Sequence, residues 1–142
     1  MSADRRAYPR AKLKWPVMIK TEEGTREGVT LDVTPDGCFI SCPKPLKLNV
    51  VFKLGIKVPK SKTTLAATAE VVWSNIYGPD DEISPRGMGV RFIKISSEAR
   101  KFIALASLEH FKSLKDKVEP ELLQTLSTLV IDLSEENQKV PS

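Results

Sequence analysis

The chain has 142 residues, of which 41% are hydrophobic, and this is enough for one domain with a core but too little for two full domains. The formal net charge of +4 and the isoelectric point near 9.1 favour anionic partners, namely nucleic acid, acidic lipid or a small phosphorylated ligand. No apolar run reaches the ~18 residues of a membrane-spanning helix, and the N-terminus lacks the apolar core of a signal peptide. We therefore expect a cytoplasmic protein that does not insert into a membrane.

Six segments show the patterns that are typical of β-strands. In the first, Leu13, Trp15, Val17 and Ile19 lie at alternate positions, and Pro16 argues for an edge position or a β-bulge. Turn residues separate the segments at short spacing, and no helical segment lies between them that would connect parallel strands. The expected fold class is therefore mostly β, a closed or nearly closed six-stranded antiparallel β-barrel followed by C-terminal α-helices. The barrel occupies residues 12–95, with strands expected at 12–20, 26–34, 37–41, 49–58, 63–74 and 87–95.

After the last strand, the spacing of apolar residues becomes helical. Ser96 or Ser97 can cap a first helix, and Pro120 suits the first turn of a second one. We expect helices over 96–134 and a flexible polar tail over 135–142. The second helix carries an apolar stripe that the barrel, a second copy of the chain or a target protein must cover, so a homodimer through this helix is one of three expectations. The stripe consists of Leu122, Leu123, Leu126, Leu129, Val130 and Leu133.

The turn after the second expected strand, Asp32-Val33-Thr34-Pro35-Asp36-Gly37, carries candidate binding residues. Pro35 presets φ at the first corner, and Gly37 stands at the exit, where a positive φ is often needed. Strict alternation along the strand places a carboxylate and a hydroxyl side by side at its end, beside a backbone that a ligand can approach closely. On this alternation the core face holds Val29, Leu31 and Val33, and the outer face holds Thr30, Asp32 and Thr34.

The N-terminal segment supplies three guanidinium groups, from Arg5, Arg6 and Arg10. Arg6 and Arg10 form an R-x-x-x-R motif, and the 21 residues from 11 to 31 separate it from the D-x-T-x-x-G of the turn. This combination resembles the PilZ domain family, bacterial domains that bind the second messenger cyclic di-GMP through R-x-x-x-R and [D/N]-x-S-x-x-G. The resemblance covers residues 4–111 and includes Val71-Val72-Trp73 and the segment 87–92, which are similar to the closing strands of the family's barrel. The sequence departs from the family pattern at Thr34, where serine is usual.

The resemblance implies a PilZ-type barrel that acts as a receptor for cyclic di-GMP, without enzymatic activity, cofactor or metal. The chemistry of guanine supports the same residues, because its O6 and N7 accept from an arginine fork and its N1–H and N2–H₂ donate to a carboxylate such as Asp32. Guanidinium groups also pair with phosphate and stack on purines. The candidate ligand-binding residues are Arg5, Arg6, Arg10, Asp32, Thr34 and Gly37.

Residues 1–11 form an arginine-rich ligand-binding arm before the barrel. Tyr8 is its one apolar anchor, so we expect most of the arm to be disordered without ligand. Cyclic di-GMP would order the arm across the mouth of the barrel and thereby relay the signal to an unidentified effector protein.

Two other functions remain as alternatives. A degenerate PilZ-like adaptor would act by protein contacts without ligand, and Thr34 keeps this alternative open. A small basic barrel that binds nucleic acid would need exposed aromatic residues beside its basic strands. Aromatic residues are only 6% of the chain, and we expect Trp15 and Trp73 in the core or at the barrel rim, so no nucleic-acid partner is expected.

The remaining reactive side chains point to no further site. Cys38 and Cys42 fall about 13 Å apart on one expected strand, too far for a disulfide, and are expected to be free thiols. The acidic run over 80–82 is expected to be solvated rather than metal-binding. His110 has no neighbouring ligand set and is a poor basis for zinc binding or catalysis.

Overall fold

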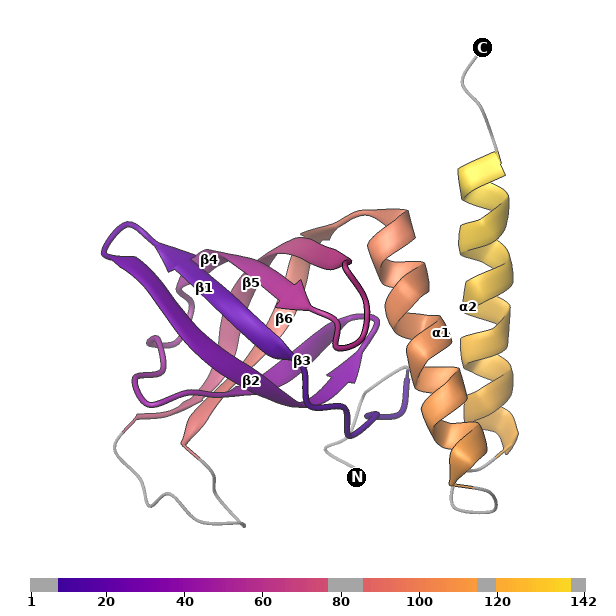
Figure 1. Cartoon of the computed structure of the whole chain (residues 1–142), viewed down its shortest axis with the longest axis horizontal. Helices are drawn as coiled ribbons and strands as arrows, with labels where there is room; N and C mark the ends of the chain where they lie inside the picture. Colours follow the sequence, from indigo (N-terminus) through magenta and orange to yellow (C-terminus); the bar gives the residue numbers. More distant parts are fainter. Residues whose placement is uncertain (1–7, 77–85, 115–119, 139–142) are drawn as a thin grey trace.

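The computed structural model describes residues 8–76, 86–114 and 120–138, as a β-barrel with a pair of helices beside it (Figure 1). The strands pair antiparallel and close into a barrel in the order β1-β2-β3-β6-β5-β4. The predicted fold class, a six-stranded antiparallel barrel followed by helices, is confirmed. The elements are β1 (Pro16–Thr21), β2 (Gly24–Thr34), β3 (Gly37–Ser41), β4 (Val51–Lys57), β5 (Thr64–Asn75), β6 (Gly87–Ile95), α1 (Ser97–Ser113) and α2 (Pro120–Gln138).

Alternate side chains of the strands fill the barrel interior. In β4, Phe52, Leu54 and Ile56 are buried, and the residues between them are exposed or half-buried. Ile19 of β1 and Ile40 of β3 are fully buried in the same core. Burial of each such side chain is worth about 1.5–3 kcal/mol relative to exposure. This apolar interior fixes the strands on which the candidate site lies.

β1 begins at Pro16, later than the expected start at residue 12. Proline lacks a backbone N–H, and the first position of a strand tolerates this loss. The chain before β1 nevertheless follows β2, because the Thr30 N–H donates to the Trp15 carbonyl at 2.9 Å and the Trp15 N–H donates to the Thr30 hydroxyl at 2.8 Å.

The segment from Tyr8 to Ala11 also lies on the barrel. Tyr8 is half-buried and packs against the hydrophobic core. Ala11 is fully buried and exchanges two backbone hydrogen bonds with Val33, at 3.0 and 2.9 Å. The end of the arm expected over 1–11 is therefore held by the barrel, and residues 1–7 lie outside the described part of the chain.

A β-bulge at Leu31 interrupts the alternation of β2. Thr30 pairs with Ile40 of β3, and Asp32 pairs with the adjacent Phe39. Two steps along β2 thus correspond to one step along β3, so Leu31 has no partner across the ladder. The extra residue reverses the inward and outward positions beyond it.

The predicted faces of β2 are consequently wrong at Val29, Thr30 and Leu31, whereas Val33, beyond the bulge, lies in the core as predicted. Thr30 and Val33 are fully buried, whereas Val29 and Leu31 are only half-buried. Thr30 can lie in the interior because its hydroxyl accepts from the backbone of Trp15 and donates to the Leu13 carbonyl at 2.6 Å. A buried hydroxyl with partners avoids most of the cost of losing water.

Gly37 is required for a different reason from the one predicted. Among the described glycines only Gly24 has a positive φ, 129°, so Gly37 does not serve a left-handed backbone. A Cβ at position 37 would lie 2.2 Å from the carbonyl oxygen of Val90. Glycine therefore allows β3 to approach β6 closely just after the turn.

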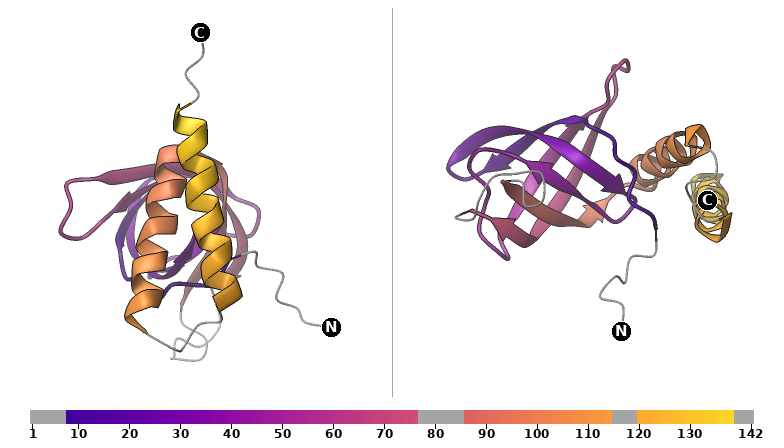
Figure 2. Two further views of the ribbon diagram at one scale, coloured as in Figure 1. Left: turned by 90° about the vertical axis from the view of Figure 1, so that its right-hand side faces the viewer. Right: turned by 90° about the horizontal axis from the view of Figure 1, so that it is seen from below.

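The helices form a layer in which α1 lies between the barrel and α2, as both Figure 1 and the right view of Figure 2 show. The Ser96 side chain caps α1 by accepting from the Ala99 N–H at 3.0 Å. Leu126, Leu129 and Leu133 of α2 are buried, and α2 makes its contacts with α1. The apolar stripe is thus covered by α1, a partner that was not among the three expected, because each helix has an apolar face that the other covers.

α2 continues through Gln138, four residues beyond the expected end of the helical region at 134. Glutamate and glutamine favour helices, and the residues from 135 to 138 contain neither glycine nor proline. Part of the segment expected to be a flexible tail is therefore helical, and residues 139–142 are not described. Neither α1 nor α2 is long and apolar enough to cross a membrane.

Candidate functional site

An open groove of about 620 Å³ lies on the outer surface of the barrel over β2, β3, β6 and β5. Four of the predicted site residues line it, Arg10, Asp32, Thr34 and Gly37. Residues far apart in sequence thus meet at one surface, the first before β1 and the others at the turn between β2 and β3. Arg5 and Arg6 lie outside the described residues, so the structure does not place them.

One row of residues crosses the groove. Asp32 pairs with Phe39, Phe39 with Gly89, and Gly89 with Trp73. Residues paired across antiparallel strands share a face of the sheet, so the row presents a carboxylate and two aromatic rings to the same space. A Cβ on Gly89 would contact Phe39 and Trp73 at 3.8 and 3.6 Å. The absence of a side chain at Gly89 therefore leaves the groove open between the two rings.

Phe39 and Trp73 are site residues that the sequence analysis missed. Their ring centroids are 5.4 Å apart, and Trp73 is 47% exposed. A bulge in β5 causes the exposure of Trp73. Val71 pairs with Val90 but Trp73 pairs with the adjacent Gly89, which leaves Val72 as an extra residue on β5. Trp73 therefore does not lie in the core, one of its two expected places, whereas Trp15 is 6% exposed and lies in the core as predicted. Three consecutive apolar residues at 71–73 were the available signal, since strict alternation would not place them all inside.

Thr34 builds the turn with its hydroxyl. The oxygen accepts from the backbone N–H groups of Asp36 and Gly37, both at 3.1 Å, and the hydroxyl donates to the Gly37 carbonyl at 3.2 Å. Thr34 is only 9% exposed. The predicted outward hydroxyl beside Asp32 is therefore wrong, and Thr34 shapes the groove through the turn backbone.

Charges of both signs surround the groove. Arg10 and Asp32 line it, and Asp36 lines it from the turn. Arg100 of α1 donates from Nη2 to Oδ1 of Asp36 at 2.8 Å. The same guanidinium lies over the ring of Tyr8, 5.9 Å from its centroid. Arg100, near the start of α1, thus contacts both the turn and, at Tyr8, residues 5–10, which we call the arginine segment.

The two cysteines are free, as predicted, and both are buried. Cys38 lies under the groove, and burial raises the pKa of its thiol, which the nearby Asp32 carboxylate raises further. Burial also raises the pKa of Cys42, although the positive charge of Arg26 partly offsets this. Both thiols therefore remain protonated at neutral pH and are poor nucleophiles.

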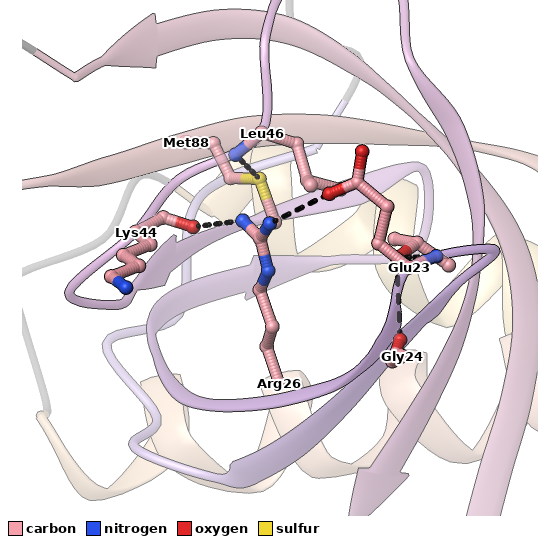
Figure 3. A network of polar contacts seen from close by, with 7 residues as sticks. Glu23, Gly24, Arg26, Lys44, Leu46 and Met88 are labelled. Atoms are coloured by element: carbon pink, nitrogen blue, oxygen red, sulfur yellow. Dashed lines mark hydrogen bonds and ion pairs between the residues drawn. The ribbon is translucent and has the colours of Figure 1, made fainter.

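Arg26 lies at the opposite end of β2, roughly 26 Å from Thr34 at the usual rise per residue. Its Nη1 donates to the Lys44 carbonyl at 2.7 Å, and its Nη2 lies 3.5 Å from Oε2 of Glu23 (Figure 3). In the same view, the Leu46 N–H donates to the sulfur of Met88 at 3.5 Å. Arg26 therefore holds the loop after β3 against the barrel.

Metal binding finds no support in the ranges 8–76, 86–114 and 120–138, where no group of three or more His, Cys, Asp or Glu residues could hold an ion. The acidic run over 80–82 falls outside these ranges.

Solved structures with the same fold include the inhibitor of motility MotI/DgrA from Bacillus subtilis, with a TM-score of 0.64 and 17% identity over 80% of this chain and 53% of that one. The PilZ domain of YcgR from Escherichia coli with c-di-GMP has a TM-score of 0.61 and 14% identity, over 81% of this chain and 100% of that one. The complex of YcgR from Escherichia coli with c-di-GMP has a TM-score of 0.51 and 14% identity, over 95% of this chain and 48% of that one. The chain thus spans about half the length of MotI. At these identities the likeness concerns the fold alone.

No curated protein sequence matches the chain. The family profile of the PilZ domain matches residues 4–107, a range that includes the arginine segment, the whole barrel and most of α1. The match therefore extends over both halves of the groove. The chain belongs to the PilZ domain family.

Proposed function

We propose that this protein is a receptor for cyclic di-GMP and that the groove over β2, β3, β6 and β5 is its binding site. One observation carries the proposal: Arg10, Asp32 and the Phe39–Trp73 pair line a single groove in a PilZ domain. Two structures of the same fold, those of YcgR and of its PilZ domain, contain this ligand. The protein acts by binding and relay, without catalysis or a cofactor.

Four side chains of the groove have roles that fit a guanine dinucleotide. The Asp32 carboxylate accepts from N1–H and N2–H₂ of a guanine, and Arg10 donates to its O6 and N7 or to phosphate. Phe39 and Trp73 offer an apolar surface for a purine face. The groove's volume, about 620 Å³, falls in the range of small-molecule sites.

The arginine segment gives the signal a route to a partner. In this proposal, Arg5 and Arg6 close on the ligand from the segment that precedes Tyr8, and residues 1–7 become ordered. The ordered segment presents a new surface to an effector protein. The segment from Tyr8 onward already lies on the barrel, so the proposed ordering concerns the residues that precede it.

The expectation of a homodimer through α2 rests on the apolar stripe of this helix. The leucine stripe that motivated it is buried against α1 within one chain. Ile131, which is 57% exposed, remains as an apolar contact on the outer side of α2. Light scattering of the whole chain should therefore give the mass of a monomer, and a dimer mass would restore the α2 interface.

Nucleic acid is favoured by one observation, the exposed Trp73 beside Phe39, because single strands stack on such rings. An oligonucleotide and cyclic di-GMP both carry bases and anionic phosphates, so the groove residues alone do not discriminate between them. An oligonucleotide is therefore the necessary control ligand.

Isothermal titration calorimetry tests the proposal with cyclic di-GMP, GTP and a short oligonucleotide. Cyclic di-GMP should bind, and the other two should bind much more weakly. Arg6→Ala, Arg10→Ala and Asp32→Ala should each lower the affinity about tenfold to hundredfold, since a charge-assisted contact is worth about 1.5–3 kcal/mol. Arg26→Ala should bind like the parent, because it removes the same charge far from the groove. No binding by the parent, or unchanged binding by the Arg10 and Asp32 variants, would refute the proposal.

A further inference from the structure

Arg100, near the start of α1, touches both halves of the proposed ligand site without lining the groove. One half is the turn, where Oδ1 of Asp36 lies 2.8 Å from Nη2 of Arg100. Asp36 itself lines the groove. The other is Tyr8, whose ring lies under the guanidinium at 5.9 Å. Tyr8 is the middle residue between Arg6 and Arg10 of the R-x-x-x-R motif. A single side chain of the helical layer thus connects the turn to the arginine segment.

The contact with Asp36 acts through charge. The groove is proposed to hold an anionic dinucleotide, yet Asp32 and Asp36 both line it. Asp32 is placed to accept from guanine, whereas a free Asp36 carboxylate would only repel phosphate. The side chains of Asp36 and Arg100 are 54% and 30% exposed, so the pair is partly screened, but the guanidinium still offsets the Asp36 charge.

The contact with Tyr8 acts through position. A guanidinium over an aromatic ring is attracted to its face, and Tyr8 is also packed against the hydrophobic core. Pro9 restricts the backbone between Tyr8 and Arg10. Holding Tyr8 therefore limits where Arg10 lies and where the preceding arginines can start, which lowers the ordering cost of binding.

We infer that Arg100 is a positioning residue for the cyclic di-GMP site, which neutralises Asp36 and holds the arginine segment on the barrel. The inference rests on the proposed function and deepens it, because it makes α1 part of the site's support. A change in the arginine segment or in the turn is then transmitted to the start of α1, and α1 carries α2 on its other side.

Calorimetry on four proteins tests the inference: the parent, Arg100→Ala, Asp36→Asn and the double variant. Arg100→Ala should weaken cyclic di-GMP binding about tenfold, the cost of ordering roughly one further residue. Adding Asp36→Asn to it should recover part of the loss, because the unpaired charge is then gone. A merely structural role of Arg100 would give no such recovery. Arg26→Ala is the matched control, since Arg26 is 31% exposed and also pairs with an acid, and it should bind like the parent.

Nuclear magnetic resonance of the ligand-free protein separates this inference from the proposed function. The side-chain protons of Arg100 should show an upfield ring-current shift, and Tyr8→Leu should remove it. If the parent does not bind cyclic di-GMP, the proposed function fails, and the shift alone decides whether Arg100 holds the segment. Binding by Arg100→Ala within twofold of a binding parent, a double variant no better than Arg100→Ala, or absence of the shift would overturn the inference.

Discussion

Thr34 and Gly37 determine the backbone conformation of the turn, whereas the side chains of Asp32 and Arg10 line the groove. The Thr34 hydroxyl satisfies two backbone N–H groups of the turn. Gly37 has no side chain, so β3 can lie close to the Val90 carbonyl of β6. The D-x-T-x-x-G motif therefore combines one residue that lines the groove with two that shape the backbone of the turn.

Gly37→Ala should destabilise the fold by about 1–3 kcal/mol, because its Cβ would overlap a backbone oxygen that cannot move aside. Gly55→Ala is the matched control in β4, where the nearest heavy atom to a new Cβ is 3.8 Å away. It should be neutral or stabilise by roughly 0.5–1 kcal/mol, since alanine loses less entropy on folding. Chemical denaturation compares the two variants, and equal free energies of unfolding would contradict the close approach at Gly37.

Thr34→Val should cost about 1–3 kcal/mol of stability, since it leaves the N–H groups of Asp36 and Gly37 without their acceptor. Thr34→Ser keeps the hydroxyl, so its stability should match the parent's, and its affinity for cyclic di-GMP should be equal or higher. Thermal unfolding and calorimetry measure the two effects. Much weaker binding by Thr34→Ser would show instead that the threonine methyl packs on the ligand.

At the scale of elements, the strands could be predicted because each carries its own period, but the bulges could not. The extra residues Leu31 and Val72 are defined by the partner strand's register, which alternation within one segment does not contain. The bulge in β5 places Trp73 in the groove, and of the row Asp32–Phe39–Gly89–Trp73 only Asp32 was predicted. The arginine segment and the turn could be paired in advance only through the family's motifs, because contacts between distant segments leave no local periodicity.

Helix pairing was missed for the same reason, and it yields a test at this scale. Leu126→Ala should destabilise the helical layer by about 2–5 kcal/mol, because Leu126 is fully buried in α2. Ile131→Ala, on the exposed side of the same helix, should change stability by less than about 0.5 kcal/mol. Far-UV circular dichroism during denaturation follows the helices. Equal effects of the two substitutions would mean that α2 does not pack on α1 as described.

In the whole molecule, three parts of the chain lie around one groove. The barrel supplies Asp32 and the aromatic pair, the segment before β1 supplies Arg10, and α1 supplies Arg100, which touches the turn and Tyr8. α1 thus contacts the segment before β1 at Tyr8 and the turn of the barrel at Asp36. Ligand binding should change the segment before Tyr8 most, the start of α1 less and the barrel least.

Amide hydrogen exchange checks this order of response. The Ala11 amide already donates to Val33, so it should be protected with and without cyclic di-GMP. Amides before Tyr8 should exchange markedly more slowly when ligand is added, because Arg5 and Arg6 then close on it, while the strands change little. Equal exchange of these amides in both states would exclude ordering of the segment as the signal.

Tryptophan fluorescence during titration with cyclic di-GMP reports whether the ligand occupies the groove. The chain has two tryptophans, of which Trp15 is 6% exposed and Trp73 is 47% exposed in the groove. Ligand in the groove should shift or quench the emission of Trp73, and the change should disappear in Trp73→Phe, which retains an aromatic ring and binding by calorimetry. A ligand that binds by calorimetry without altering the parent's emission, or an emission change that persists in Trp73→Phe, would contradict binding in this groove.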